Sequence, residues 1–164
     1  MKKNILFVCT GNSCRSVMAE GFFKKLIEGQ ADDFQVGSAG IAAIDGYGAS
    51  AQTVRVMKDL GIDVSGHKSQ LLTGAMVRLA DKIFVMEGMH REAILQNWPE
   101  ASEKVHLLTE YSAKAKQRGH NIDIPDPIQM SEHFYKNVLS VIQDCVTHIA
   151  EEFGIKTEQG KEAS

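Results

Sequence analysis

The sequence of 164 residues lacks the features that mark membrane, secreted and nucleic-acid-binding proteins. No apolar run approaches the length of a membrane-spanning helix, and the first apolar run is too short for a signal peptide. The 18 basic and 21 acidic residues give a formal net charge of −3, so no overall charge attracts nucleic acid or anionic lipid. We therefore expect neither nucleic acid nor a membrane as a partner.

Cysteine is also scarce, since the chain contains only Cys9, Cys14 and Cys145. An odd number of cysteines without disulfide-framework spacing is typical of a reducing compartment and predicts a cytoplasmic location. The six histidines form no zinc-binding pattern with these cysteines. We expect no metal and no organic cofactor.

What the sequence does contain is an alternation of short strand-like runs and helical patterns. The strand-like runs are rich in branched and aromatic residues; they are Asn4–Val8, Phe34–Gly37, Lys82–Met86 and Lys104–Leu107. The helical patterns repeat apolar residues every three to four positions; they are Val17–Glu28, Ser50–Leu60, Thr73–Ala80, Met89–Trp98 and Ser131–Phe153. This order predicts a three-layer α/β fold, with a four-stranded parallel sheet and helices on both faces. We expect one domain over residues 1–155 and a polar, frayed tail over 156–164.

The most informative stretch joins the first strand to the first helix. It contains a cysteine and an arginine separated by five residues, and a following serine; in order these residues are Cys9, Thr10, Gly11, Asn12, Ser13, Cys14, Arg15 and Ser16. The backbone N–H groups of such a loop, the positive end of the helix and a planar guanidinium can together hold a tetrahedral oxyanion. The same positive field favours the thiolate form of Cys9, a nucleophile. The loop thus predicts phosphoryl transfer to sulfur; the alternative is a small buried cysteine at a strand end.

A candidate acid follows the last predicted strand, where residues 122–127 read Ile-Asp-Ile-Pro-Asp-Pro. The prolines on both sides of Asp126 stiffen the loop. Because this loop follows the last predicted strand, Asp126 lies at the same sheet edge as Cys9. A carboxylic acid there can protonate the leaving oxygen of a phosphoester, and as a carboxylate it can later activate water. The alternatives are a turn aspartate without catalytic role, and Asp123 as the acid. We predict Asp126.

Taken together, these residues resemble the low-molecular-weight protein tyrosine phosphatase family, over essentially the whole chain to about Phe153. The resemblance rests on the Cys9–Ser16 loop, the late Asp-Pro, and the segments Ser38-Ala39-Gly40 and Gly66-His67-Lys68. It implies that Cys9 is the nucleophile, that Arg15 binds phosphate and that Asp126 is the general acid. It also implies a polar network supporting the loop, formed by Asn12, Ser16, Ser38 and His67.

The two other cysteines receive different interpretations. Cys14 matches a second loop cysteine of the family, which predicts a reversible disulfide that protects Cys9 from over-oxidation. The alternative for Cys14 is simply a small loop residue. Cys145 lies among apolar positions of the last helix, which predicts a role in core packing.

The substrate is less closely defined than the chemistry. In the family that this chain resembles, tyrosine-specific members carry a bulky aliphatic residue at the position of Ser13. The protein-arginine phosphatase branch has threonine at that position, and the hydroxyl of Ser13 resembles it. The expected substrate pocket contains Ile44, Tyr47 and Ile128, with Tyr47 as the only nearby aromatic. Hydrolysis of phosphotyrosine on proteins is therefore the first hypothesis and hydrolysis of phosphoarginine the second.

Two further alternatives rank lower. Arsenate reduction on this scaffold uses two further cysteines in the later half of the chain, and this chain has only Cys145 there. A catalytically silent module that binds phosphorylated residues would be expected to lack Cys9, Arg15 or Asp126, and all three are present. The expected partner is a phosphorylated protein substrate, with a cognate kinase as a further candidate.

Overall fold

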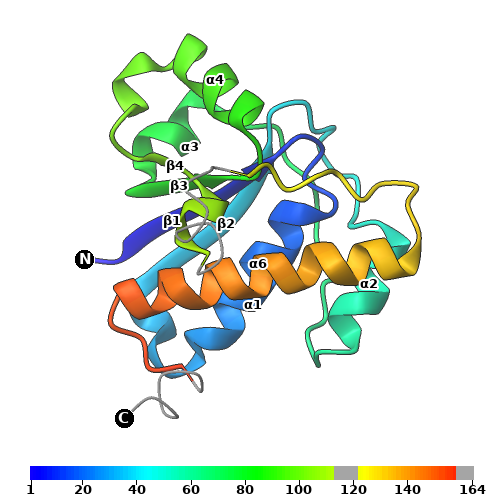
Figure 1. Cartoon of the computed structure of the whole chain (residues 1–164). Coiled ribbons are helices and arrows are strands. Elements are labelled where there is room, and N and C mark those ends of the chain that lie inside the picture. Colours follow the sequence, from blue (N-terminus) through cyan, green and yellow to red (C-terminus); the bar gives the residue numbers. More distant parts are fainter. Residues whose placement is uncertain (113–121, 158–164) are drawn as a thin grey trace.

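The computed structural model describes residues 1–112 and 122–157, and its centre is a four-stranded sheet. All strand pairs are parallel, in the order β2-β1-β3-β4 (Figure 1). The strands are β1 (Lys3–Cys9), β2 (Phe34–Gly40), β3 (Lys82–Val85) and β4 (Val105–Leu107). The predicted α/β fold with a four-stranded parallel sheet is therefore confirmed.

Helices cover both faces of this sheet, as predicted (Figure 1). Helices α1 (Arg15–Leu26) and α6 (Glu132–Glu152) lie on one face, with α2 (Ala51–Lys58) packed beside them. Helices α3 (Gly74–Leu79) and α4 (Gly88–Asn97) lie on the other. Short 3₁₀ helices complete the described elements; they are η1 (Glu28–Asp33), η2 (Pro99–Ala101) and η3 (Leu108–Tyr111).

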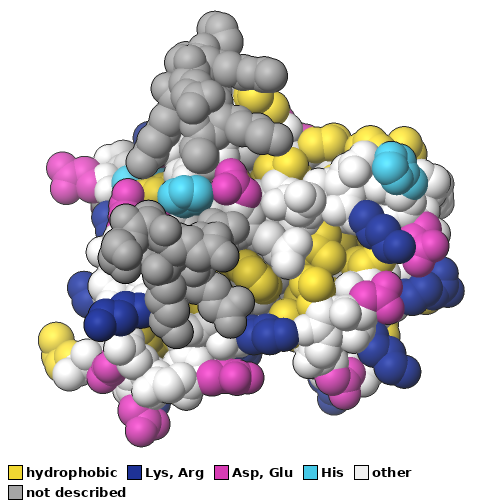
Figure 2. All heavy atoms as spheres, turned by 60° about the horizontal axis from the view of Figure 1, so that its bottom comes forward, with side chains coloured by type: hydrophobic (Ala, Val, Ile, Leu, Met, Phe, Trp, Pro, Cys, Tyr) yellow, Lys and Arg dark blue, Asp and Glu magenta, His cyan; other side chains and the backbone are white. Residues whose placement is uncertain are grey.

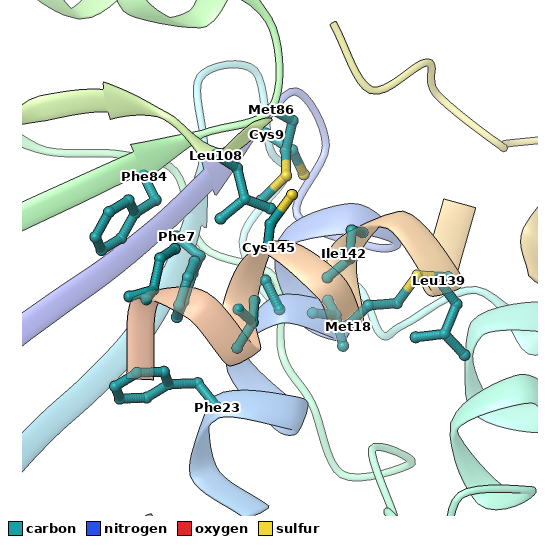
Figure 3. Close-up of a cluster of buried hydrophobic side chains, with 14 of the residues drawn as sticks. Phe7, Cys9, Met18, Phe23, Phe84, Met86, Leu108, Leu139, Ile142 and Cys145 are labelled. Carbon is teal, nitrogen blue, oxygen red and sulfur yellow. The ribbon is translucent and has the colours of Figure 1, made fainter. Parts of the chain in front are cut away.

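The core has two parts because the sheet is buried on both faces. Phe7 and Cys9 of β1 point toward α1 and α6, whereas Leu6 and Val8 point toward α3 and α4. The first part includes stacked Phe7 and Phe84 and the thiol of Cys145, as Figure 3 shows. Cys145 is fully buried, which confirms its predicted packing role, and this burial raises its pKa to about 12.

The structure departs from the predicted boundaries next to the loop, where β1 also includes Cys9. Strand β2 continues through Ser38 to Gly40 rather than ending at Gly37, because these residues pair with Phe7–Cys9 of β1. Helix α1 begins at Arg15, so the arginine belongs to its first turn. Cys9 and Ser38 therefore lie on strands, and Arg15 lies on a helix.

The start of the predicted tail packs against the domain rather than being frayed. Thr157 is buried, and its hydroxyl donates a hydrogen bond to the Glu151 carboxylate. Residues 158–164 lie outside the described residues, so a frayed end there stays a prediction. On the face drawn in Figure 2, acidic and basic side chains are interspersed. Within the described parts of the chain, no helix has the length and apolar character of a membrane span.

We predict that Gly40→Ala deforms the Cys9 loop. An added Cβ would collide with the carbonyl oxygen of Thr10 and lie 2.9 Å from the backbone nitrogen of Asn12. Neither backbone atom can rotate aside, so we expect a loss of roughly 1–3 kcal/mol in the free energy of unfolding, together with reduced activity. The matched control on the same strand is Gly37→Ala, whose Cβ would meet only Leu6 at 3.9 Å. Urea unfolding checks this, and equal destabilisation by the two changes would contradict it.

Candidate active site

The Cys9 loop connects the carboxyl end of β1 to the first turn of α1. Cys9 is the last residue of β1 and Arg15 the first of α1, and both side chains are buried. No side chain caps the start of α1, so the N–H groups of its first turn remain available to a ligand. The loop therefore places a thiol, a guanidinium and the positive end of a helix in one place, the combination that binds an oxyanion.

Asn12 fixes the shape of this loop from inside the protein. It is fully buried, and its backbone takes the left-handed conformation, with φ at 53°. Its side-chain amide donates to the hydroxyls of Ser16 (2.8 Å) and Ser38 (2.9 Å). Its backbone carbonyl accepts a hydrogen bond from Nε2 of His67 at 2.9 Å. The structure thus brings together all four residues of the predicted polar network.

Two partners of Asn12 were not predicted. The hydroxyl of Ser69 donates to the Asn12 carbonyl at 2.7 Å, and the backbone N–H of Gln70 donates to its side-chain oxygen at 3.0 Å. Both lie in an irregular segment that gives no pattern in the sequence.

Ser16 contacts the sulfur of Cys9. Its hydroxyl oxygen lies 3.0 Å from the Cys9 sulfur. Because the same oxygen accepts a hydrogen bond from Asn12, its own hydrogen is left to point toward the sulfur. A hydroxyl that donates to sulfur stabilises the anion over the thiol.

Arg15 has one edge held by the protein and another available to a ligand. Its Nη1 donates to the Ile124 carbonyl at 2.7 Å and lies 2.9 Å from the Glu87 carboxylate. Its Nη2 donates to the Thr10 hydroxyl at 3.4 Å. Its Nε is buried and has no hydrogen-bond partner in residues 1–112 and 122–157. The neighbouring Nε–H and Nη2–H groups form the edge that can bind two oxygens of an oxyanion.

The structure separates the two candidate acids. Asp126 has a side chain 44% exposed, with Oδ2 at 3.8 Å from Arg15 Nη2. Its other oxygen accepts the backbone N–H of Ile128 at 3.0 Å, which fixes the side chain in the turn. Asp123 instead accepts the backbone N–H of Gly88 at 2.8 Å, at the start of α4. Only Asp126 thus faces the anion-binding edge.

A groove of about 450 Å³ opens beside the loop. The three predicted pocket residues, Ile44, Tyr47 and Ile128, line it together with Ser13 and Gly11. Their side chains are well exposed, at 63%, 66% and 45% respectively, so the apolar walls lie near the mouth. The groove can take a flat or extended group attached to a phosphate held by the loop.

Cys14 is not among the residues that line this groove. Its thiol is buried, donates to the Ser50 hydroxyl at 3.4 Å, and lies 3.5 Å from the Tyr135 hydroxyl. Burial, together with the contact from Cys14, raises the pKa of Tyr135 to about 12. Cys9 and Cys14 are both free thiols here, and a disulfide between them stays a prediction. Ser50 and Tyr135 were not predicted as partners of the loop.

A second unpredicted group consists of Glu87 and His90, which follow β3. His90 is fully buried, and its Nε2 lies 2.8 Å from the Thr10 hydroxyl. Burial, and after it the charge of Arg15, lowers the pKa of His90 from 6.5 to about 4. The imidazole is therefore neutral at physiological pH. In the described parts of the chain, no cluster of three or more His, Cys, Asp or Glu side chains could hold a metal ion.

Comparison with known proteins connects this geometry to a family. The family model for the low molecular weight phosphotyrosine protein phosphatase matches residues 4–159. The chain is 38% identical to the probable low molecular weight protein-tyrosine-phosphatase EpsP of Ralstonia nicotianae, over 87% of this chain and 90% of that protein. It is 31% identical to the protein-arginine-phosphatase of Geobacillus stearothermophilus, over 97% and 100%. The structure of Vibrio vulnificus Wzb in complex with benzylphosphonate superimposes with a TM-score of 0.81, at 35% identity, over 93% and 99%.

We predict that His90 makes stability fall in mild acid. The unfolded chain binds a proton at His90 with the ordinary pKa of 6.5, whereas the folded protein does so only near 4. The unfolded state therefore binds more protons between these values, and stability falls as pH is lowered through this window. The contribution is about 2 kcal/mol between pH 7 and pH 4.5. Urea unfolding at both pH values checks it: His90→Gln should show a smaller pH dependence than the wild type, and an unchanged dependence would contradict the assignment.

Proposed function

The chain belongs to the low molecular weight phosphotyrosine protein phosphatase family, and we propose that it hydrolyses phosphotyrosine on proteins through a phosphocysteine intermediate. The observation that carries this proposal is Arg15, a buried guanidinium with an open donor edge beside Cys9. Glu87 already balances the charge of Arg15, but a buried N–H donor without an acceptor is costly, and an oxyanion at this edge would accept from it. The phosphoryl group of the substrate is such an anion.

In the first step the Cys9 thiolate attacks the phosphorus of the bound ester. The S–P bond forms as the P–O bond to the leaving group breaks, and the electron pair departs with the leaving oxygen. Asp126 supplies the proton to that oxygen. Arg15 and the backbone N–H groups of the loop hold the remaining phosphoryl oxygens, where negative charge gathers.

In the second step water attacks the phosphocysteine. Asp126, now a carboxylate, takes a proton from this water, and the S–P bond breaks with its electron pair returning to sulfur. The Ser16 hydroxyl, 3.0 Å away, stabilises the departing thiolate. Inorganic phosphate is released, and no cofactor takes part in either step.

The groove favours phosphotyrosine as the substrate. Its mouth is lined by Tyr47 and by the aliphatic Ile44 and Ile128, which can pack against a phenyl ring. Phosphoarginine is the second candidate, supported by the Ser13 hydroxyl in the same groove and by the similarity to a protein-arginine-phosphatase. Arsenate reduction is not proposed, because the only cysteine outside the loop, Cys145, is fully buried in the core.

The same chemistry supports a proposal for the location of the protein and for one partner. A nucleophilic thiolate works only while reduced, and all three cysteines are free thiols, which supports a cytoplasmic location. A cognate kinase that phosphorylates the same protein target remains a candidate partner.

We predict that Asp126→Asn affects substrates according to their leaving groups. An asparagine cannot protonate the departing oxygen, so turnover of phenyl phosphate should fall by about 100-fold, whereas p-nitrophenyl phosphate, whose anion leaves readily, should lose far less. Steady-state kinetics with both esters checks this. Cys9→Ser is the control, since it should abolish turnover of both. An equal loss of both substrates in Asp126→Asn would exclude Asp126 as the acid.

We further predict that Ser13 sets the preference between the two candidate substrates. Peptides of identical sequence carrying phosphotyrosine or phosphoarginine are compared by kcat/KM, and the wild type should prefer phosphotyrosine. Ser13→Ile should shift the ratio by about tenfold further toward phosphotyrosine, because an aliphatic group packs on a ring and offers no hydrogen bond to a guanidinium. Ser102→Ile, at an exposed position outside the groove, is the matched control. A large wild-type excess for phosphoarginine would overturn the first choice.

A further inference from the structure

We propose that His90 is a positioning residue for Arg15, acting through the Thr10 hydroxyl and together with Glu87. The proposal rests on the proposed function, since it concerns how the guanidinium is aimed at the oxyanion. A histidine that merely fills the core needs satisfied ring nitrogens and nothing more. His90 differs because the side chains of both Thr10 and Glu87, which it contacts, also contact Arg15.

The hydrogen bonds of His90 determine which ring nitrogen carries the proton. The backbone N–H of Glu87 donates to Nδ1 at 3.1 Å, so Nδ1 must be the acceptor. The neutral ring then carries its hydrogen on Nε2, which donates to the Thr10 hydroxyl oxygen at 2.8 Å. Protein contacts therefore fix the direction of this bond.

The Thr10 hydroxyl is oriented as a result. Its oxygen accepts hydrogen bonds from His90 and from Nη2 of Arg15, which occupies both lone pairs. The hydroxyl hydrogen is left without an acceptor among the described residues. An oxyanion held at the open edge of Arg15 would supply one, so Thr10 can add a donor at the rim of the site.

Glu87 completes the arrangement from the other side. Its Oε2 lies 2.9 Å from Nη1 of Arg15 and 3.6 Å from Nε2 of His90. At the start of α4, the backbone N–H of His90 donates to the backbone carbonyl of Glu87 at 3.0 Å, and the backbone N–H of Glu87 donates to Nδ1 of His90. Glu87 and His90 thus fix each other, and together they hold the two terminal nitrogens of Arg15. The edge formed by Nε–H and Nη2–H is left facing the ligand.

The experiment uses inorganic phosphate as the anion probe and p-nitrophenyl phosphate as the substrate. His90→Ala and Thr10→Val should each raise the inhibition constant of phosphate and lower kcat/KM by about tenfold, the effect of one lost polar contact in a binding site. If His90 acts through Thr10, the double variant should lose little more than either single variant. Thr10→Ser, which retains the hydroxyl, should restore phosphate binding.

A control variant and a replacement variant complete the experiment. His148→Ala, in the last turns of α6, is the matched control and should bind phosphate like the wild type. Should His90→Ala fail to fold, His90→Gln, which keeps an N–H donor, replaces it and should retain most binding. Losses that multiply in the double variant, or unchanged phosphate binding in Thr10→Val, would overturn the role of His90. A wild-type protein that neither binds phosphate nor cleaves the ester would instead refute the proposed function.

Discussion

The rest of the site depends on the hydrogen bonds that Asn12 makes with its side chain and its backbone carbonyl. Its side-chain amide joins the loop to β2 and α1 through buried hydrogen bonds, and its backbone carbonyl joins the loop to the segment after residue 66 through a partly buried one. A typical buried hydrogen bond contributes about 1 kcal/mol net, but leaving its partner unsatisfied costs more. The left-handed backbone at this position is therefore held by several contacts at once.

The order of the strands explains why the other residues meet this loop. The chain runs from β1 to β2 on one side and returns to β3 on the other, so the carboxyl end of β1 lies where the winding changes direction. Segments that follow three different strands converge there. Ile44 and Tyr47 of the groove follow β2, Glu87 and His90 follow β3, and Asp126 and Ile128 come after β4. The site is thus assembled from residues far apart in the sequence, at the carboxyl end of β1, where the chain winding changes direction.

Much of this could be predicted from the sequence because local patterns carry it. The sheet follows from short branched runs, and the anion loop from residue types at fixed spacing. The end of β2 was missed because Ser38, Ala39 and Gly40 are not typical strand formers, and only pairing with β1 makes them extended.

Glu87 and His90 were missed for a different reason. The sequence Met-Glu-Gly-Met-His resembles an ordinary helix start, and nothing local reveals that it faces an arginine 72 positions earlier than Glu87. Tyr135 was hidden in the same way within the apolar pattern of α6. Ser69 and Gln70 lie in a segment without periodicity. Contacts that depend on tertiary placement leave no trace in a single sequence.

The open edge of Arg15 has a consequence for the protein at work. A guanidinium prepared for a phosphoryl group does not distinguish the ester from the free ion that the reaction leaves behind. Under the proposed function, inorganic phosphate from the medium therefore competes with the substrate for this site, and the occupied fraction depends on the phosphate concentration and its dissociation constant. Release of the phosphate product and the ambient phosphate concentration would then limit turnover together with the proposed reaction at Cys9.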